Sequence, residues 1–381
     1  MIYLLKKELL EVIRDRRTLF SMLIVPLIAF PAIIGITGYF TKKGVEKISS
    51  MSIKIFVYSE TLSDTFELYL RDQNLSLVKT THPMDTVSKE SPAAVFIYPG
   101  EIEVLYDASS EKGREALRRI QSATAEYKDY QIKESLSRLG VPHEIVEPFK
   151  LKVTNLATTQ RMFGMSIGIF LGYLLVILMF SSAMYAAIDL TAGEKERRTM
   201  EVLLSSVPSR KRIVYAKVSA VSLVAFISSV LLVISWTVSL LYFGGGLFNG
   251  ELAGFSLLIS PGILISFLLL IAPFAVFVAS LEVTFASFAR SFREAQSYLT
   301  PLLMLAILPA IVSILPGMSE WATWKAFVPV MNITSSLKGI LQKELSTIDL
   351  LLTITINLIY TGIASVASVY LFSREEILFR E

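Results

Sequence analysis

Six apolar blocks, each long enough to cross a bilayer, divide this chain of 381 residues. A hydrocarbon core takes about 20 helical residues. The blocks are Thr18–Phe40, Phe163–Leu190, Val214–Phe243, Phe255–Ala289, Ala295–Leu315 and Ile348–Phe372. With 53% hydrophobic residues, 18% charged residues and a mean hydropathy of +0.58, the chain is too apolar for an ordinary soluble enzyme. We predict an α-helical polytopic membrane protein with six transmembrane helices, the fourth kinked or broken at Pro273.

Lys and Arg are concentrated in alternate short segments between the blocks. They precede the first block and lie between the second and third, as Lys6, Lys7, Arg14, Arg16, Arg17, Lys195, Arg197, Arg198, Arg210, Lys211, Arg212 and Lys217. The short segment Gly244–Leu252 contains none. Because cytoplasmic loops carry the excess of Lys and Arg, both termini and the loop 191–213 are predicted to be cytoplasmic.

The first 17 residues have helical amphipathicity beside the first block, with Leu5, Leu9 and Val12 on one face. Residues 1–17 are therefore predicted to form a cytoplasmic interfacial helix, and residues 18–40 the first transmembrane helix. The alternative is that residues 1–17 anchor a partner.

Residues 41–161 are polar, and they contain the clear strand patterns of the chain. Apolar and β-branched residues mark strands at Ser52–Glu60, Leu75–Thr80, on both sides of Pro99-Gly100 and at Glu147–Leu156, with helices at Leu62–Asp72 and about Ser110–Arg138. His82 and His143 lie in loops without metal-ligand spacing, so we assign them no catalytic or metal role. We predict an extracytoplasmic α/β domain, inserted between the first and second transmembrane helices. Residues 162–381 then hold helices two to six.

Several functional classes are excluded by what the sequence lacks. It has no cysteine, no H-E-x-x-H pattern and no G-x-x-x-x-G-K-[ST] phosphate loop, so no metal site is assigned and ATP cannot bind in the P-loop manner. The net charge of +3 is too small to argue for nucleic acid. Any ATP-driven process therefore needs a second polypeptide.

The stretch Gly164–Gly168 matches G-x-S-x-G, the nucleophile elbow of hydrolases. That elbow requires a strand before the serine and a histidine base, whereas Ser166 lies in an apolar helix and both histidines lie in the polar segment. Gly164, Gly168 and Gly172 are four residues apart, which places them on one helix face. We interpret them as a site of close helix packing.

The loop between the second and third blocks reads AGEKERRTMEVLLSSVPSRKR, Ala192–Arg212. Gly193 is placed to break the span, the acidic residues after it suit a helix start, and Pro208 ends the pattern. The residues themselves favour two readings equally: a short amphipathic helix against the membrane, or a solvated basic anchor.

This loop closely resembles the signature of type 2 ABC transporter permeases, the transmembrane subunits of ABC exporters. The matching motifs are the Gly-Glu-Lys-Glu that begins at Gly193 and the Thr-x-Glu-x-Leu-Leu that begins at Thr199. Ser280–Leu302, Pro329–Leu341 and Phe372–Phe379 are similar to stretches of the sodium-efflux permeases in that family. The resemblance covers essentially the whole chain.

The resemblance implies a permease subunit of an ATP-driven exporter in a prokaryotic plasma membrane. The loop would be a coupling helix that docks on an ABC ATPase subunit, which binds ATP and Mg²⁺; this chain would hold no cofactor. The contact residues would be Gly193, Glu194, Lys195, Glu196, Arg197, Thr199, Glu201, Leu203, Leu204 and Pro208, supported by Arg290, Arg293 and Glu294. A second permease copy, or a homologous permease, would complete the pore. The cargo would be sodium ions, or drugs, peptides or lipids on the same scaffold.

Ionisable residues within a membrane helix are functional candidates. Glu282, with Thr284 and Asn357, is a candidate cation ligand on a translocation path, and the alternative is a structural hydrogen-bonding role. Near the opposite surface, Trp321 and Trp324 indicate a re-entrant or interfacial helix. Two other functional classes remain open: a membrane-anchored sensor with an external ligand-binding domain, and an intramembrane hydrolase, for which Ser166 lacks a base.

Overall fold

The computed structural model describes residues 2–59, 63–80, 92–98, 101–108, 110–140, 159–200, 203, 209–247, 260–313, 315, 321–372 and 374. The chain forms two compact units. One unit comprises Met1–Gly38 and Leu156–Glu381, and the other comprises Tyr39–Asn155.

The helices and helical turns of the first unit come from both of its parts of the chain. In chain order they are α1 (Ile2–Arg14), α2 (Arg16–Leu19), the π-helical turn η1 (Phe20–Ile24), α3 (Val25–Ser50), α6 (Thr159–Ile188), the π-helical turn η3 (Asp189–Gly193), α7 (Glu194–Glu196), α9 (Arg210–Leu247), α11 (Pro261–Ala286), α12 (Phe292–Val312), the 3₁₀ turn η4 (Thr323–Phe327), α13 (Met331–Gln342) and α14 (Thr347–Phe372). The residues of α3 beyond Gly38 belong to the second unit.

The end of α1 and the start of α2 are set by Asp15. Its carboxylate accepts hydrogen bonds from the backbone N–H groups of Arg17 and Thr18, at 3.2 and 3.0 Å. This is an N-cap, which satisfies donors that lack an intrahelical partner. The amphipathic helix therefore stops at Arg14, and a new helix leads into the first apolar block.

Within the described residues, six helical segments are long and apolar enough to cross a membrane, as predicted. They are Arg16–Ile33, Phe170–Glu196, Arg210–Ser239, Pro261–Ala286, Phe292–Val312 and Thr347–Phe372. Helix α11 packs against α6, α9 and α14, and α9 also packs against α6 and α14. The fourth span was predicted to be kinked or broken at Pro273, and it is not broken, since α11 runs continuously through this residue. A proline is tolerated in a spanning helix because neighbouring helices satisfy the polar groups that it exposes.

Helix α13 is buried on all sides although it carries many polar residues. Every residue from Met331 to Leu341 is buried, and the helix packs against α6. It follows Val330, whose φ of 70° is unusual for a β-branched residue. Within the predicted re-entrant or interfacial segment, at 315–329, the described residues form the 3₁₀ turn η4, and the buried helix α13 follows this segment.

The second unit contains a four-stranded sheet. The strands are β1 (Ile53–Ser59), β2 (Leu75–Lys79), β3 (Ala93–Tyr98) and β4 (Glu101–Tyr106), in the order β2-β1-β3-β4. Strand β1 pairs in parallel with β2 and β3, whereas β3 and β4 are antiparallel. Helix α4 (Asp64–Asp72) connects the parallel pair β1 and β2, as a crossover connection requires.

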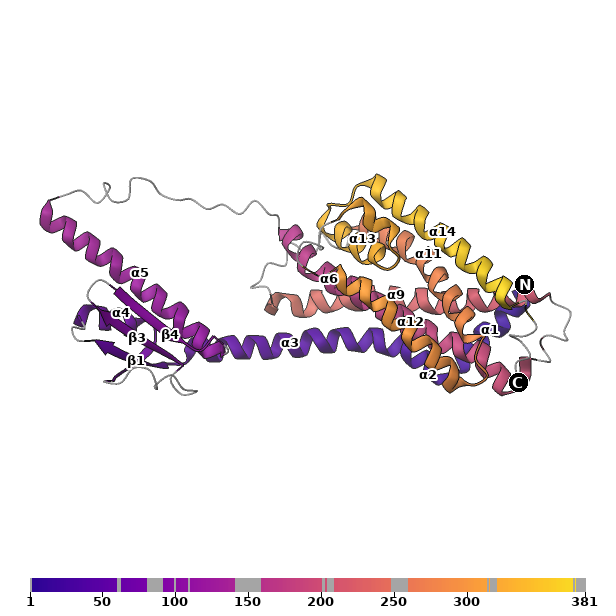
Figure 1. The fold of residues 1–381 in the computed structure, drawn as a ribbon, viewed down its shortest axis with the longest axis horizontal. Helices are drawn as coiled ribbons and strands as arrows, with labels where there is room; N and C mark the ends of the chain where they lie inside the picture. The colour runs from indigo at the N-terminus through magenta and orange to yellow at the C-terminus, as the bar shows by residue number, and fades with distance from the viewer. Residues whose placement is uncertain are drawn as a thin grey trace. The chain divides into compact units, whose positions relative to one another are not determined.

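Helices α4 and α5 (Glu111–Leu139) cover one face of this sheet (Figure 1). Phe66 and Leu70 of α4 pack with Ile120 of α5 on the alternate residues Ile55 and Val57 of β1, because alternate strand residues point to one side of a sheet. The strands and helices described here lie where the sequence predicts them. The predicted strand at 147–156, Pro99-Gly100 and both histidines lie outside the described residues.

Candidate functional site

The second apolar helix continues into the signature loop without interruption. Helix α6 passes into η3 and then into α7, so Gly193 does not break the span. A Cβ at Gly193 would lie 3.2 Å from Oδ1 of Asp189 and 3.3 Å from Nη2 of Arg197. The chain turns away only at Arg198, whose φ is 59°. The π-helical turn rotates the motif relative to the rest of α6, and such turns are frequent at functional sites.

The centre of the site is Lys217 of α9. Its Nζ donates to Oε2 of Glu194 at 2.6 Å and to the backbone oxygen of Leu190 at 2.5 Å. It also donates to both carboxylate oxygens of Glu8, each at 3.4 Å. The side chains of Lys217 and Glu8 are 0% exposed and that of Glu194 is 1% exposed. Three helices therefore meet at one buried ammonium group.

Lys7 brings a second positive charge to the same carboxylates. It donates to Oε1 of Glu194, and it lies 3.1 Å from Oε2 of Glu11. Burial alone would lower the pKa of Lys7, but the hydrogen bond and charge of Glu194 raise it above the ordinary value. Burial raises the pKa of Glu8, against the opposing effect of Lys217. We call the buried Glu8, Glu194 and Lys217, together with the half-buried Lys7, the buried charge cluster.

The carboxylates of this cluster have a spacing that suits a metal ion, since oxygen atoms of Glu8, Glu11 and Glu194 lie within 4.8 Å of one another. Lys7 and Lys217, however, already donate to these oxygens. The positive charge is supplied by the chain itself, so we assign the cluster to the chain's internal ion pairing and not to a metal site.

Removing one partner from such a cluster is costly. A buried ion pair adds little net stability compared with apolar packing. Deleting one member, however, leaves an uncompensated buried charge, which lowers the free energy of unfolding by about 3–5 kcal/mol. The cluster therefore holds α1, the end of α6 and the start of α9 in one fixed arrangement.

The next two motif residues reach two further helices. Lys195 Nζ donates to the backbone oxygen of Ser287, just beyond α11, at 2.5 Å. Oε2 of Glu196 accepts the backbone N–H of Phe292, the first residue of α12, at 2.9 Å. Negative charge at a helix N-terminus is favourable because the helix dipole is positive there. The loop is thus bonded to the ends of the fourth and fifth apolar helices.

The segment between these two helices is a capping arrangement. Ser291 is the N-cap of α12, and its Oγ accepts the backbone N–H of Glu294 at 3.4 Å. Glu294 in turn accepts the backbone N–H of Arg290 at 2.7 Å and the hydroxyl of Tyr298 at 2.7 Å. Arg290 and Arg293 are exposed. The Ser-x-x-Glu spacing is a known capping signal, and it predicts this role for Glu294 from sequence.

The remaining motif residues form an exposed surface. Glu196, Arg197, Arg198 and Thr199 are exposed. Arg197 is paired with Asp189 at 3.0 Å, and Thr199 Oγ1 donates to the backbone oxygen of Glu194 at 3.2 Å. Leu203 is half-buried, and Glu201, Leu204 and Pro208 lie outside the described residues. The motif therefore has a buried half at Gly193 and Glu194 and an exposed half at 196–199.

Comparison with known proteins places this loop in a family. The model for the family described as ABC-2 family transporter protein matches residues 2–377. The chain belongs to the ABC-2 family of transporter proteins. The ABC transporter permease protein NatB of Bacillus subtilis (strain 168) is 21% identical over 352 residues, which cover 89% of each chain. No solved structure matches the chain.

Membership of the ABC-2 family confirms the resemblance to type 2 ABC transporter permeases. Together with the six apolar helices, it identifies the chain as a multi-pass membrane protein. The buried charge cluster is therefore a feature of an ABC-2 transporter. Glu8 was not among the predicted site residues, and no buried contact was predicted for Lys217.

The three candidate path residues of this ABC-2 transporter do not meet. Thr361 Oγ1 donates to the backbone oxygen of Pro273 at 2.7 Å, which aligns α14 with α11. Asn357 lies four residues before Thr361, and Glu282 lies nine residues after Pro273. Asn357 and Glu282 are therefore roughly 20 Å apart along the helix axes. Asn357 accepts a hydrogen bond from Nδ2 of Asn332 at 2.9 Å. Its amide belongs to the packing of α13 against α14.

Glu282 itself is 1% exposed in α11, and its Oε2 has no hydrogen-bond partner among the described residues. Thr284 Oγ1 donates to the backbone oxygen of Ser280 at 2.6 Å, so its hydroxyl is used within the helix. Glu282 and Asn357 each retain a buried polar atom without a described partner, but that of Asn357 is the donor Nδ2, so Glu282 is the candidate with an unused oxygen acceptor.

The glycines of α6 contact the buried helix α13. A Cβ at Gly168 would lie 2.9 Å from the Cα of Lys338, and one at Gly172 would lie 3.0 Å from the Cα of Thr334. Gly164 lies one turn earlier in the same helix, and the surroundings of its Cα are not described. Only glycine permits two helix backbones to approach this closely, which agrees with the packing interpretation.

Proposed function

We propose that this chain is the permease subunit of an ATP-driven exporter and that its signature loop couples it to a separate ABC ATPase subunit. The buried charge cluster carries this proposal. It makes the loop mechanically continuous with α1, α6 and α9, and a solvated basic anchor would need no buried ion pairs. The ATPase subunit would bind the ATP and Mg²⁺.

The two halves of the motif have separate parts in this proposal. The exposed half, at 196–199, docks on the ATPase. Glu194 is revised from a direct contact to a transmitting residue, because its carboxylate is enclosed by Lys7 and Lys217. Lys195 and Glu196 pass the same displacement to α11 and α12. A rigid element transmits movement that a flexible loop would absorb.

The proposed orientation follows from the basic residues. Lys and Arg at the start of the chain and in the loop place both termini and the docking surface in the cytoplasm of a prokaryotic cell. The unit Tyr39–Asn155 would then be extracytoplasmic, at residues predicted as 41–161. A second copy of the chain, or a homologous permease, would complete the translocation path, and we place the complex in the plasma membrane.

Sodium ions are the proposed cargo, and the resemblance to sodium-efflux permeases supports this choice. Among the described residues of the apolar spanning helices, Glu282 is the carboxylate with a buried oxygen that has no hydrogen-bond partner, which is chemistry suited to a cation. Drugs, peptides or lipids are the alternative cargo classes, for which the carboxylate would be a packing residue.

The test is co-purification with the partner ATPase, followed by ATP hydrolysis in lipid discs. We expect Arg198→Glu to abolish ATPase binding, because it reverses an exposed charge on the docking surface. Lys195→Met should retain binding but lose the stimulation of ATP hydrolysis by cargo. Lys128→Glu, an exposed reversal in the other unit, is the matched control and should behave as wild type.

The outcome separates the open classes. Binding of the ATPase by Arg198→Glu as strong as that of wild type would reject the docking surface. If the wild-type chain itself holds no ABC ATPase, the exporter proposal fails, and the sensor with an external ligand-binding domain takes its place.

A further inference from the structure

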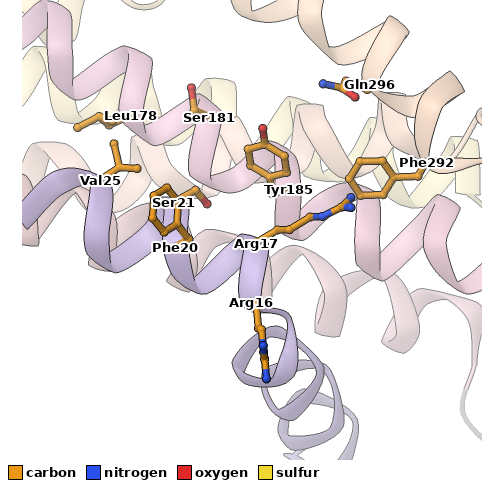
Figure 2. Close-up of a pocket in the computed structure, with 10 residues that line it drawn as sticks. All are labelled: Arg16, Arg17, Phe20, Ser21, Val25, Leu178, Ser181, Tyr185, Phe292 and Gln296. Carbon is orange, nitrogen blue, oxygen red and sulfur yellow. The ribbon is translucent and has the colours of Figure 1, made fainter. Parts of the chain in front are cut away.

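A pocket of about 720 Å³ lies between the start of the first apolar helix, α6 and the start of α12. Its volume is within the range of about 300–1,000 Å³ that is typical of small-molecule sites. Figure 2 shows the side chains that line it. No function proposed above uses this pocket.

The lining carries two arginines at one end and is mainly apolar at the other, where Ser21 and Ser181 also line it (Figure 2). Arg16 and Arg17 of α2 lie at the polar end, and Phe20, Val25 and Leu178 make the apolar wall. From Arg16 to Val25 the helix rises about 14 Å. In Figure 2 the Arg17 side chain extends toward Phe292, whereas Arg16 lies at the rim and points away. A ligand for this pocket needs an anionic head and an apolar tail.

The positive charge of Arg17 is not neutralised by a neighbouring carboxylate. None of the ten lining residues is acidic, and within the described part of the chain no carboxylate lies within ion-pairing distance of Arg17. The nearest acid in sequence, Asp15, accepts from the backbone N–H groups of Arg17 and Thr18. The guanidinium instead lies over the ring of Phe292, with its carbon 5.4 Å from the ring centroid, a stacking that positions it.

We propose that this pocket holds one anionic phospholipid from the leaflet that faces the signature loop. The phosphate binds Arg17, with Arg16 at the rim, and an acyl chain lies along Phe20, Val25 and Leu178. The positive charge of the arginines favours an anionic headgroup. The order of arginines and then apolar residues along the membrane helix matches the order of headgroup and acyl chain in a lipid. The lipid joins α2, α6 and α12 beside the loop. Its assignment to the cytoplasmic leaflet rests on the proposed orientation, whereas the binding itself does not.

The experiment measures lipid binding by the full chain in discs, by native mass spectrometry and by melting temperature. We compare phosphatidylglycerol with phosphatidylcholine, and with free glycerol phosphate added to phosphatidylcholine discs. Wild type should retain phosphatidylglycerol selectively and melt at a higher temperature with it. Arg17→Gln should weaken phosphatidylglycerol binding about tenfold, as expected for loss of a charge-assisted hydrogen bond.

Two variants complete the test. Arg14→Gln removes an exposed arginine of α1 that does not line the pocket, and it should bind the lipid as wild type does. Val25→Trp fills the apolar end and should lose the lipid while melting normally in phosphatidylcholine. The lipid assignment is overturned if Arg17→Gln keeps the selectivity for phosphatidylglycerol. It is also overturned if glycerol phosphate alone raises the melting temperature as much as phosphatidylglycerol does.

The lipid assignment would also be overturned if the pocket residues become protected from solvent only when two copies of the chain associate. A second copy would then be the occupant of the pocket. None of these readouts requires the ATPase. A failure of the exporter proposal would therefore leave the lipid result standing, and the reverse is also true.

Discussion

Nζ of Lys217 lies 2.6 Å from Oε2 of Glu194, and both side chains are buried. The two residues come from different apolar helices, on either side of the signature loop. Their contact means that the loop cannot shift without moving α9, unless the ion pair breaks. The contribution of this ion pair to the free energy of unfolding can be measured directly.

Substitution of Lys217 by methionine should strongly destabilise the chain. Glu194 and Glu8 would lose their shared buried cation, and we expect a loss of about 3–5 kcal/mol in the free energy of unfolding. Denaturant titration of the purified chain in detergent measures the change. Lys211→Met, an exposed lysine of the same helix, should stay within about 0.5 kcal/mol of wild type. Equal changes in the free energy of unfolding for the two substitutions would show that the cluster does not stabilise the fold.

The packing of α6 on α13 should depend on the absence of side chains at Gly168 and Gly172. Gly168→Ala places a Cβ 2.9 Å from the backbone of Lys338, and we expect it to destabilise the chain by about 1–3 kcal/mol. At Gly362 of α14 nothing lies within 4 Å of the added Cβ. Gly362→Ala should therefore be neutral or stabilising, since alanine favours helix. Melting temperatures of the two variants test this, and a Gly168→Ala protein as stable as wild type would refute the close approach.

Acid should loosen helix α5 through Glu115. Hydrogen bonds from Arg118 are the main cause that lowers the pKa of Glu115 from 4.5 to about 2, with Arg119 adding to it. A lowered carboxyl pKa adds stability that is complete above pH 4.5 and lost as the pH falls toward 2. Glu115→Gln should lack this pH dependence and be less stable at neutral pH by about 1 kcal/mol.

Amide hydrogen exchange of α5 in the intact chain follows this effect from pH 5 downward. Arg119 also donates to the backbone oxygen of Met51 at 2.9 Å, so protection next to β1 should change together with that of α5. If wild type and Glu115→Gln lose protection in parallel, the carboxylate is not the titrating group.

Glu282 distinguishes cation cargo from the alternatives. If the carboxylate binds sodium, Glu282→Gln should raise the sodium concentration for half-maximal stimulation of ATP hydrolysis about tenfold, or about 1.4 kcal/mol. Its melting temperature should change little, because no described hydrogen bond is lost. Unchanged sodium stimulation would make Glu282 a packing residue. Thr284→Val, which removes a hydroxyl bonded only to its own helix, is the control.

The apolar helices and the sheet could be predicted because their signals are local. Six long apolar blocks and alternating strands such as Ile53–Ser59 leave few other structures possible. The continuity of α11 through Pro273 could not be predicted in this way. It depends on the packing of α11 against neighbouring helices such as α9 and α14, and these neighbours are known only from the fold.

The candidate site was predictable only in part for the same reason. The motif that begins at Gly193 was found from its residues, and its likeness to a family suggested docking. Which half of it would be buried depends on Glu8, separated from Lys217 by 209 positions. No local pattern links two charges at that distance. The capping role of Glu294, by contrast, was readable from Ser291 three residues earlier.

The distance in sequence between Glu8 and Lys217 also orders the events of biosynthesis. Glu8 leaves the ribosome 209 residues before the lysine that balances its charge, which at about 5–20 residues per second is a delay of roughly 10–40 s. During that interval Lys7 of the same helix is the cation beside Glu8, and the contact with Lys217 that buries the carboxylate cannot form. The first helix to be synthesised therefore completes its docking only after α9 has been made, and a nascent chain arrested before Lys217 should still expose α1 to protease.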